Sequence, residues 1–139
     1  MQYILRQASI QDLEILDRIY TANIKDYVEK FYSWNERLFR DGFIPEEYQI
    51  VEIEQKVVGF IKIVTSTTDV YLGEIQIAKE YQNRGIGTSL LNLIIDRAKA
   101  NNHRLWLKVI KNNPAEKLYQ RLGFVVFEES LTHKKMQII

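Results

Sequence analysis

A seven-residue segment in the middle of the chain combines the residue types that a phosphate group requires. It reads Gln82-Asn83-Arg84-Gly85-Ile86-Gly87-Thr88. The segment joins a β-branched run to the strongest helical pattern of the chain, so its backbone N–H groups would stand at the positive end of a helix. Glycine lets a ligand approach that backbone, Arg84 adds a charged donor and Thr88 a hydroxyl. The pattern predicts a site for a diphosphate.

Two common nucleotide motifs follow similar logic but do not fit this segment. A P-loop needs Gly-Lys-Ser/Thr at its end, and a dinucleotide fingerprint needs a third glycine or an alanine where Leu90 stands. The segment therefore favours neither ATP nor NAD. A purely structural interpretation is also open, because Gly85 and Gly87 could serve only to permit a tight turn from strand to helix.

A second segment, about thirty residues further on, reads Asn113-x-Ala115-x-x-Leu118-Tyr119-x-x-x-Gly123-Phe124. Taken in order, the two segments resemble the GNAT superfamily of N-acetyltransferases. The first matches the family's acetyl-CoA signature, Q/R-x-x-G-x-G/A, and the second its N-x-x-A-x-x-L-Y-x-x-x-G-F segment. The resemblance is specific over residues 72–127 and topological before them.

The resemblance implies a fold and a cosubstrate. The fold would be α/β (α+β), with a mixed, mostly antiparallel sheet of about seven strands, splayed central parallel strands and flanking helices. The slot between the splayed strands would take the pantetheine arm of acetyl-CoA, paired with the backbone of the strand before the signature. The cofactor-binding residues are then Ile75, Gln76, Ile77, Gln82, Asn83, Arg84, Gly85, Ile86, Gly87, Thr88, Asn113 and Lys117. Asn113 also suits a helix N-cap, and Lys117 a solvated helix face.

Acetyl transfer to an amine needs a neutral nucleophile and a proton for the departing thiolate. The resemblance assigns the second task to Tyr119, as general acid. Glu74 would project from its strand on the face opposite Ile75, where it could take a proton from the amine. Two structural interpretations stand beside these roles: Tyr119 as a core aromatic, and Glu74 on a solvated strand face.

The predicted function is transfer of an acetyl group from acetyl-CoA to a primary amine, by direct attack in a ternary complex. A small-molecule or peptide amine would be the acceptor, and the enzyme would be a monomer or homodimer. Aromatic residues of the N-terminal half could line an acceptor slot or simply cover the sheet; they are Tyr27, Phe31, Tyr32, Trp34 and Phe39. Two other functions stay open: a non-catalytic acyl-CoA-binding module, and a scaffold that binds a partner protein.

Hydrophobic periodicity and turn residues predict the elements that must position these groups. In chain order they are a strand at 2–7, a helix capped by Ser9, helical structure from Asn23 to Phe43, strands at 48–54 and 57–65 joined by a turn at Gln55-Lys56, a strand at 70–78, a helix at 85–101, a strand at 105–110, a helix at 113–122, and strands at 124–127 and 133–139. This order describes a single domain over residues 1–139 with a mixed sheet.

Composition narrows the functions further. The formal net charge is +1 over 139 residues, which provides no broad field for nucleic acid. The absence of cysteine excludes disulfides and thiolate ligands, and with two histidines a metal site is not expected. No run of about 18 apolar residues and no secretory leader is evident, so we expect no membrane partner and a cytoplasmic location.

Overall fold

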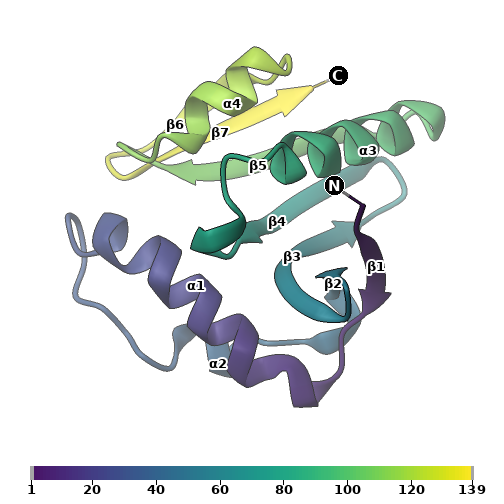
Figure 1. Cartoon of the computed structure of the whole chain (residues 1–139). Helices are drawn as coiled ribbons and strands as arrows, with labels where there is room; N and C mark the ends of the chain where they lie inside the picture. Colours follow the sequence, from purple (N-terminus) through teal and green to yellow (C-terminus); the bar gives the residue numbers. More distant parts are fainter. Residues whose placement is uncertain (1, 139) are drawn as a thin grey trace. The chain divides into compact units, whose positions relative to one another are not determined.

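The computed structural model describes residues 2–138, and in it seven strands form one sheet in the order β1-β2-β3-β4-β5-β7-β6 (Figure 1). The strands are β1 (Ile4–Gln7), β2 (Tyr48–Ile53), β3 (Lys56–Thr65), β4 (Asp69–Ile77), β5 (Arg104–Ile110), β6 (Val125–Glu129) and β7 (His133–Ile138). The helices are α1 (Leu13–Val28), α2 (Leu38–Asp41), α3 (Ile86–Ala100) and α4 (Ala115–Arg121). Three single 3-10 turns lie at Ile10–Asp12, Pro45–Glu47 and Lys79–Tyr81.

The pairing of the strands confirms the predicted fold class. β4 and β5 are parallel, with Asp69–Leu72 opposite Arg104–Leu107. The pairs β1–β2, β2–β3, β5–β7 and β6–β7 are antiparallel. A mixed, mostly antiparallel sheet with flanking helices is therefore present. The splaying of the two parallel strands stays a prediction, and the last residue of the predicted strand at 133–139 lies outside the described residues.

The chain divides into two compact units, which are described separately. The first comprises residues up to Lys62 together with Glu74–Gly87. The second comprises Ile63–Gly73 together with the residues from Thr88 onward.

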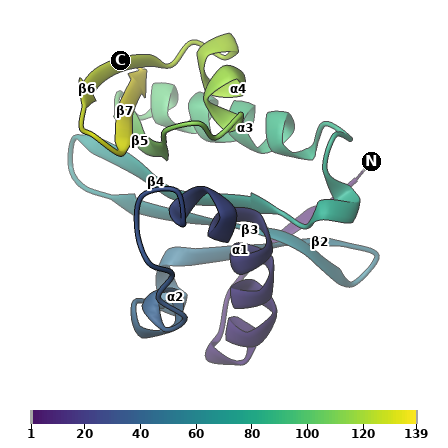
Figure 2. The ribbon, with the colours of Figure 1, turned by 90° about the vertical axis from the view of Figure 1, so that its left-hand side faces the viewer.

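In the first unit, α1 and α2 lie on the same side of β2 and β3 (Figure 2). Phe39 of α2 is at the centre of an aromatic core: its ring lies 4.8 Å from that of Tyr20 and 5.7 Å from that of Phe60. Leu16 and Ile19 of α1 complete this core. Burying such rings supplies much of the free energy that fastens a helix to a sheet.

The predicted helical stretch from Asn23 to Phe43 is wrong in its extent. The helix that begins at Leu13 runs on to Val28, because its apolar positions keep a helical period that far. After it, only Leu38–Asp41 is helical. The aromatic residues in between lie in turns and irregular structure although Phe31 and Trp34 are three positions apart, and Phe39 and Phe43 belong to the core.

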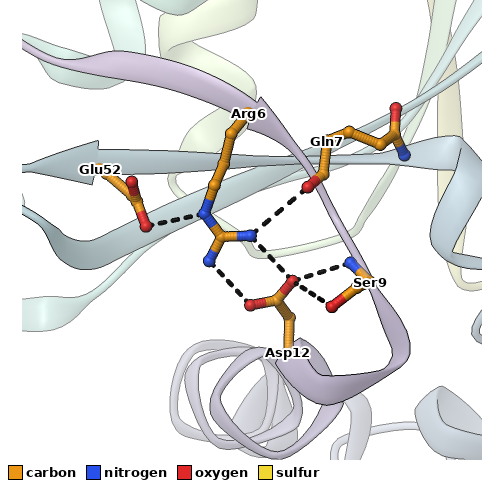
Figure 3. Close-up of polar contacts among 5 residues, drawn as sticks. All are labelled: Arg6, Gln7, Ser9, Asp12 and Glu52. Atoms are coloured by element: carbon orange, nitrogen blue, oxygen red, sulfur yellow. Dashed lines mark hydrogen bonds and ion pairs between the residues drawn. The ribbon is translucent and has the colours of Figure 1, made fainter.

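A charged cluster fastens the start of the first helical segment to the edge of the sheet (Figure 3). The Arg6 guanidinium on β1 donates to both carboxylate oxygens of Asp12, at 3.0 and 2.8 Å, and through Nε to Glu52 of β2 at 2.8 Å. The backbone N–H of Ser9 donates to Asp12 as well, at 2.8 Å. These contacts hold the pKa of Asp12 below its ordinary value, with the Arg6 hydrogen bond as the largest cause.

The β2–β3 hairpin turns one residue earlier than predicted. Glu54 and Gln55 have φ values of 51° and 67°, the left-handed conformation that two-residue hairpin loops require. Lys56 is already paired with Ile53. The turn is therefore Glu54-Gln55, although neither residue type is a typical choice for a positive φ.

In the second unit, α4 packs against β7, and Glu116 of α4 forms an ion pair with Lys134 of β7 at 2.9 Å. Leu107 of β5 and Met136 of β7 are opposite each other in the register and fully buried. Gly123 ends α4 with a φ of 106°, as its position after the helical pattern predicts. Trp106 of β5 stacks on Tyr71 of β4 at 4.3 Å.

Gly59 lies at a close approach of β3 to β4. A Cβ on Gly59 would clash with the backbone oxygen of Gln76 and would lie 2.9 Å from Cδ1 of Ile77. Near this point the N–H of Ala78 donates to the carbonyl of Val58 at 2.8 Å. The two backbones can come this close only because Gly59 has no side chain.

We predict that Gly59→Ala lowers the free energy of unfolding by about 1–3 kcal/mol. The backbone carbonyl of Gln76, and with it β4, must move to accommodate the methyl group. Chemical denaturation measures this. Gly42→Ala is the matched control: its Cβ would lie 3.4 Å from the Leu38 oxygen, and its φ is −95°. We expect a change within about 0.5 kcal/mol there. Equal midpoints for the two variants would contradict the close strand approach.

Candidate functional site

The loop before α3 folds back sharply on itself. Asn83 and Gly85 have φ values of 63° and 86°, both left-handed. The helix then begins at Ile86, and an α-helix leaves the N–H groups of its first turn without acceptors inside the helix. Ile86 as a residue is only 3% exposed, so its apolar side chain is part of the core. The exposed guanidinium of Arg84 lies 5.3 Å above the Tyr81 ring.

The two glycines of this loop are explained differently. A Cβ built on either Gly85 or Gly87 meets nothing within 4 Å, so neither glycine is there to make room for protein atoms. The positive φ of Gly85 is reason enough for that glycine. Gly87 lies in the first turn of α3, where a glycine costs helix stability and no turn requires it. Open space at the Cβ positions of Gly85 and Gly87, next to Arg84 in the chain, leaves room for a diphosphate near the start of α3.

The Gln82 side chain turns toward the end of β4. Its Nε2 donates to the carbonyl oxygen of Ile77 at 2.9 Å and to Oδ1 of Asn23 at 3.3 Å. The first residue of the predicted signature thus joins the loop to β4 and α1. Asn83 is exposed, and Thr88 is half-buried in the first turn of α3. Direct contact of these three residues with a cofactor stays a prediction.

Glu74 and Gln76 lie two residues apart on β4 and therefore share one face of the strand. Gln76 Nε2 donates to Oε1 of Glu74 at 2.9 Å. From α1, Asn23 Nδ2 donates to Oε1 of Gln76 at 3.1 Å and to the carbonyl of Ile77 at 2.9 Å. Ile75 and Ile77, the neighbouring positions of the strand, are half-buried.

The Glu74 carboxyl group is a base of unusual strength for its type. It is half-buried, and this burial raises its pKa to about 7, against the opposing effects of the Gln76 hydrogen bond and the Lys62 charge. Burial, followed by the charge of Glu74, also raises the pKa of Tyr20 on α1. Glu74 does not lie on a fully solvated strand face, which was the alternative interpretation.

In the second unit, Tyr119 of α4 is buried, with 8% of its surface exposed and its ring edge-on to Phe124 at 5.8 Å. Asn113 acts as a helix cap, because its Oδ1 accepts from the N–H of Ala115 at 2.9 Å. Lys117 is exposed on the same helix. The predicted cofactor contacts of Asn113 and Lys117 and the acid role of Tyr119 stay predictions.

Of the aromatic residues suggested for an acceptor slot, Phe39 belongs to the buried core instead. Trp34 is half-buried, with its ring 6.0 Å from that of Tyr20, and Tyr32 is 52% exposed. Besides Gln76, three residues lie around Glu74 in its own unit that the sequence did not single out. They are Tyr20, Asn23 and Lys62.

A signal for Asn23 was present in the sequence. Leu16, Ile19 and Asn23 are spaced by three and four residues, so they form one stripe of α1. A polar side chain on the inner stripe of a helix needs a hydrogen-bond partner inside the protein.

Metal and membrane features can be stated for the described residues only. Within residues 2–138, no three His, Cys, Asp or Glu side chains gather as a metal site would need. None of the helices described there has the length and apolar character to cross a membrane.

Comparison with known proteins identifies the family. The Acetyltransferase (GNAT) family pattern matches residues 9–124, most of the chain, so the protein belongs to this family. The predicted resemblance is thereby confirmed. An uncharacterised N-acetyltransferase from Methanocaldococcus jannaschii is 29% identical over 88% of the chain. The chain spans 60% of the length of that curated relative.

Solved structures share the fold over nearly the whole chain. The PaiA N-acetyltransferase of Thermoplasma acidophilum, in complex with coenzyme A, is 21% identical with a TM-score of 0.79, over 99% of this chain and 98% of that one. Naa50 of Arabidopsis thaliana, in complex with the bisubstrate analogue CoA-Ac-MVNAL, is 19% identical with a TM-score of 0.74, over 100% and 99%. The ribosomal-protein-S18-alanine N-acetyltransferase of Escherichia coli is 22% identical with a TM-score of 0.74, over 99% and 93%.

We predict that Gly87→Val weakens the binding of coenzyme A at least about tenfold, a loss of about 1.4 kcal/mol, because a branched side chain would fill the space above the helical N–H groups. Isothermal titration calorimetry measures the affinity. Free space at Gly87 means that the fold itself accepts the change, so the melting temperature should stay close to that of the wild type. At Gly85 the same substitution would mix ligand effects with backbone strain.

The control is Asn92→Val, which places the same side chain on an exposed position of α3. Its coenzyme A affinity should equal that of the wild type. Undiminished affinity in Gly87→Val would mean that the loop is only a turn.

Proposed function

We propose that residues 1–139 form one acetyltransferase domain, which moves the acetyl group of acetyl-CoA to a primary amine by direct attack in a ternary complex. Membership of the GNAT family supports the reaction class. The observation that carries the proposal is the Glu74 carboxyl group, whose pKa of about 7 suits a general base at neutral pH.

In this proposal the amine nitrogen attacks the thioester carbonyl carbon, a C–N bond forms and the C–S bond breaks. Glu74 takes the proton that the nitrogen loses, directly or through one water molecule. A glutamate with an ordinary pKa near 4.3 would be a weak acceptor for that proton. Tyr119 gives a proton to the departing sulfur, as its match to the family's tyrosine suggests.

The remaining residues would hold acetyl-CoA. The N–H groups of Ile86, Gly87 and Thr88 would receive the diphosphate together with Arg84, supported by Gln82, Asn83 and Gly85 in the loop. The backbone of Ile75, Gln76 and Ile77 would pair with the pantetheine arm. Asn113 and Lys117 would contact other parts of the coenzyme. Open space above Gly85 and Gly87 supports this assignment.

The pKa of the amine favours one class of acceptor. An α-amino group has a pKa of about 7.7–8.0 and a lysine side chain one of about 10.4. Proton transfer from an α-ammonium group to Glu74 is uphill by about one pKa unit, and from lysine by more than three. The difference between the two amines is about 3 kcal/mol with any base. We propose the α-amine of a peptide as acceptor, because a larger fraction of it is neutral near pH 7. The bisubstrate analogue bound to Naa50 and the substrate named for the Escherichia coli protein are in line with this class.

The test is thiol release from acetyl-CoA with short peptides that carry a free N-terminus, measured from about pH 5.5 to about pH 8.5. Below pH 7, kcat/KM should fall about a hundredfold per unit, because protonation of the amine and protonation of Glu74 each lower it about tenfold per unit. In Glu74→Gln, the limb that belongs to Glu74 should vanish and kcat should drop at least about 100-fold. The limb that belongs to the amine itself, near about pH 8, should persist.

Glu36→Gln, an exposed position in the same unit, is the matched control and should retain the profile of the wild type. A peptide with a blocked N-terminus and one lysine tests the acceptor class and should react much more slowly. Full activity of Glu74→Gln would refute the base. No thiol release with any amine would refute the proposed function.

We expect Tyr119→Phe to lower kcat roughly 100-fold or more, because the phenyl ring preserves the packing and loses only the proton donor. Coenzyme A affinity, measured by calorimetry, should change by less than about twofold. Tyr3→Phe is the matched control. It removes a hydroxyl group just before β1, in the first unit, and should leave kcat unchanged. If Tyr119→Phe were fully active, another group would have to protonate the thiolate.

A further inference from the structure

Three side-chain amides form a chain of hydrogen bonds that ends on the Glu74 carboxylate. Gln82, in the loop before α3, donates to Oδ1 of Asn23 at 3.3 Å. Asn23 of α1 donates to Oε1 of Gln76 at 3.1 Å, and Gln76 of β4 donates to Glu74 at 2.9 Å. Every member lies in the first unit, and the chain runs from the cofactor loop to the base of the proposed function.

The direction of this chain follows from one carbonyl group. The oxygen of Ile77 accepts from Asn23 Nδ2 and from Gln82 Nε2, each at 2.9 Å. A backbone carbonyl can only accept, so the nitrogen ends of both amides must face it. With its nitrogen shared between Ile77 and Gln76, Asn23 requires the oxygen end of the Gln76 amide to face α1. The nitrogen end of Gln76 then faces Glu74.

We propose that Asn23 is a positioning residue for acetyl transfer, which through the Gln76 amide holds the Glu74 carboxylate in place as an ionised base; this rests on the proposed function. Without Asn23, the Gln76 amide can rotate and present its oxygen to Glu74. An oxygen beside a carboxylate disfavours the ionised form, whereas an N–H donor favours it.

Two other groups of the first unit interact electrostatically with Glu74, and neither is altered chemically when Asn23 is replaced. Lys62 of β3 acts through its positive charge and lowers the pKa of Glu74. Tyr20 of α1 is held neutral, because burial and the Glu74 charge raise its own pKa. A change in the titration of Glu74 in Asn23 variants can therefore be attributed to the Gln76 amide.

The experiment is an NMR titration of the Glu74 carboxyl carbon in the full chain, which needs no turnover and no ligand. In Asn23→Ala, we expect the midpoint to rise by about 0.5–1 pH unit relative to the wild type. Asn23→Leu keeps nearly the size of the side chain and has neither an N–H donor nor a charge, so it should shift the midpoint in the same direction even if Asn23→Ala folds poorly. Asn92→Ala, an exposed asparagine on α3, is the matched control and should show no shift.

A double-mutant cycle separates positioning from packing. If Asn23 acts through Gln76, then Asn23→Ala should add almost nothing to the shift already caused by Gln76→Ala. Additive shifts would overturn the proposal, as would a Glu74 midpoint in Asn23→Ala and Asn23→Leu within about 0.2 unit of the wild type. A helix that merely packs less well would lower the melting temperature and leave the midpoint where it is.

Kinetics link the titration to catalysis. The limb of kcat/KM near pH 7 should move upward in Asn23→Ala by the same amount as the NMR midpoint. A limb that stays in place while the midpoint moves would overturn the positioning role. Failure of the proposed function gives a different result. The Glu74 midpoint would still shift in the Asn23 variants, but the wild-type protein would release no thiol with any amine.

Discussion

One carbonyl oxygen at the end of β4 determines how the candidate base is held. The oxygen of Ile77 accepts hydrogen bonds from Asn23 and from Gln82, and because it cannot donate, it fixes the nitrogen end of each amide. A helix, a strand and the loop before α3 meet in these two bonds. The Gln76 amide, and with it the Glu74 carboxylate, takes its orientation from the same contact.

The Asn23 contact depends on where α1 lies, and two features of the first unit determine that. Aromatic rings from α1, α2, β2 and β3 pack together around Phe39. At the other end, the Arg6–Asp12 pair fastens the chain just before Leu13. Since the pKa of Asp12 lies below its ordinary value, the stability contributed by this pair is present at neutral pH and is lost as the pH falls through the folded-state pKa. The geometry around Asn23 is therefore maintained at the pH where acetyl transfer would occur.

Sequence reasoning predicted the parts of the site that local patterns specify. Periodicity and turn residues predicted the order of the elements, which the structure confirms. The two motifs carried the resemblance to the family, which the comparisons confirm. Sequence reasoning misplaced the Glu54-Gln55 turn, because Lys56 is held in the β3 register by pairing that turn preferences do not encode. It overlooked Asn23 because the partners of that residue lie more than fifty positions away. Hydrogen bonds between distant segments leave no periodic trace, only a polar residue on an apolar stripe.

The alternation of β4 lets one short strand serve two purposes, at a cost. The side chains of Glu74 and Gln76 share one face, and the backbone of the strand is the part proposed to pair with the pantetheine arm. Burial of Glu74 raises its pKa from 4.5 to about 7, so between these values the folded state binds more protons than the unfolded chain. Stability therefore decreases as the pH rises through that range. The Gln76 hydrogen bond and the Lys62 charge both favour the ionised carboxylate and offset part of this loss. A carboxylate basic enough to deprotonate an amine therefore lowers the stability of the folded state when it is ionised. The hydrogen-bonded amides offset part of this loss.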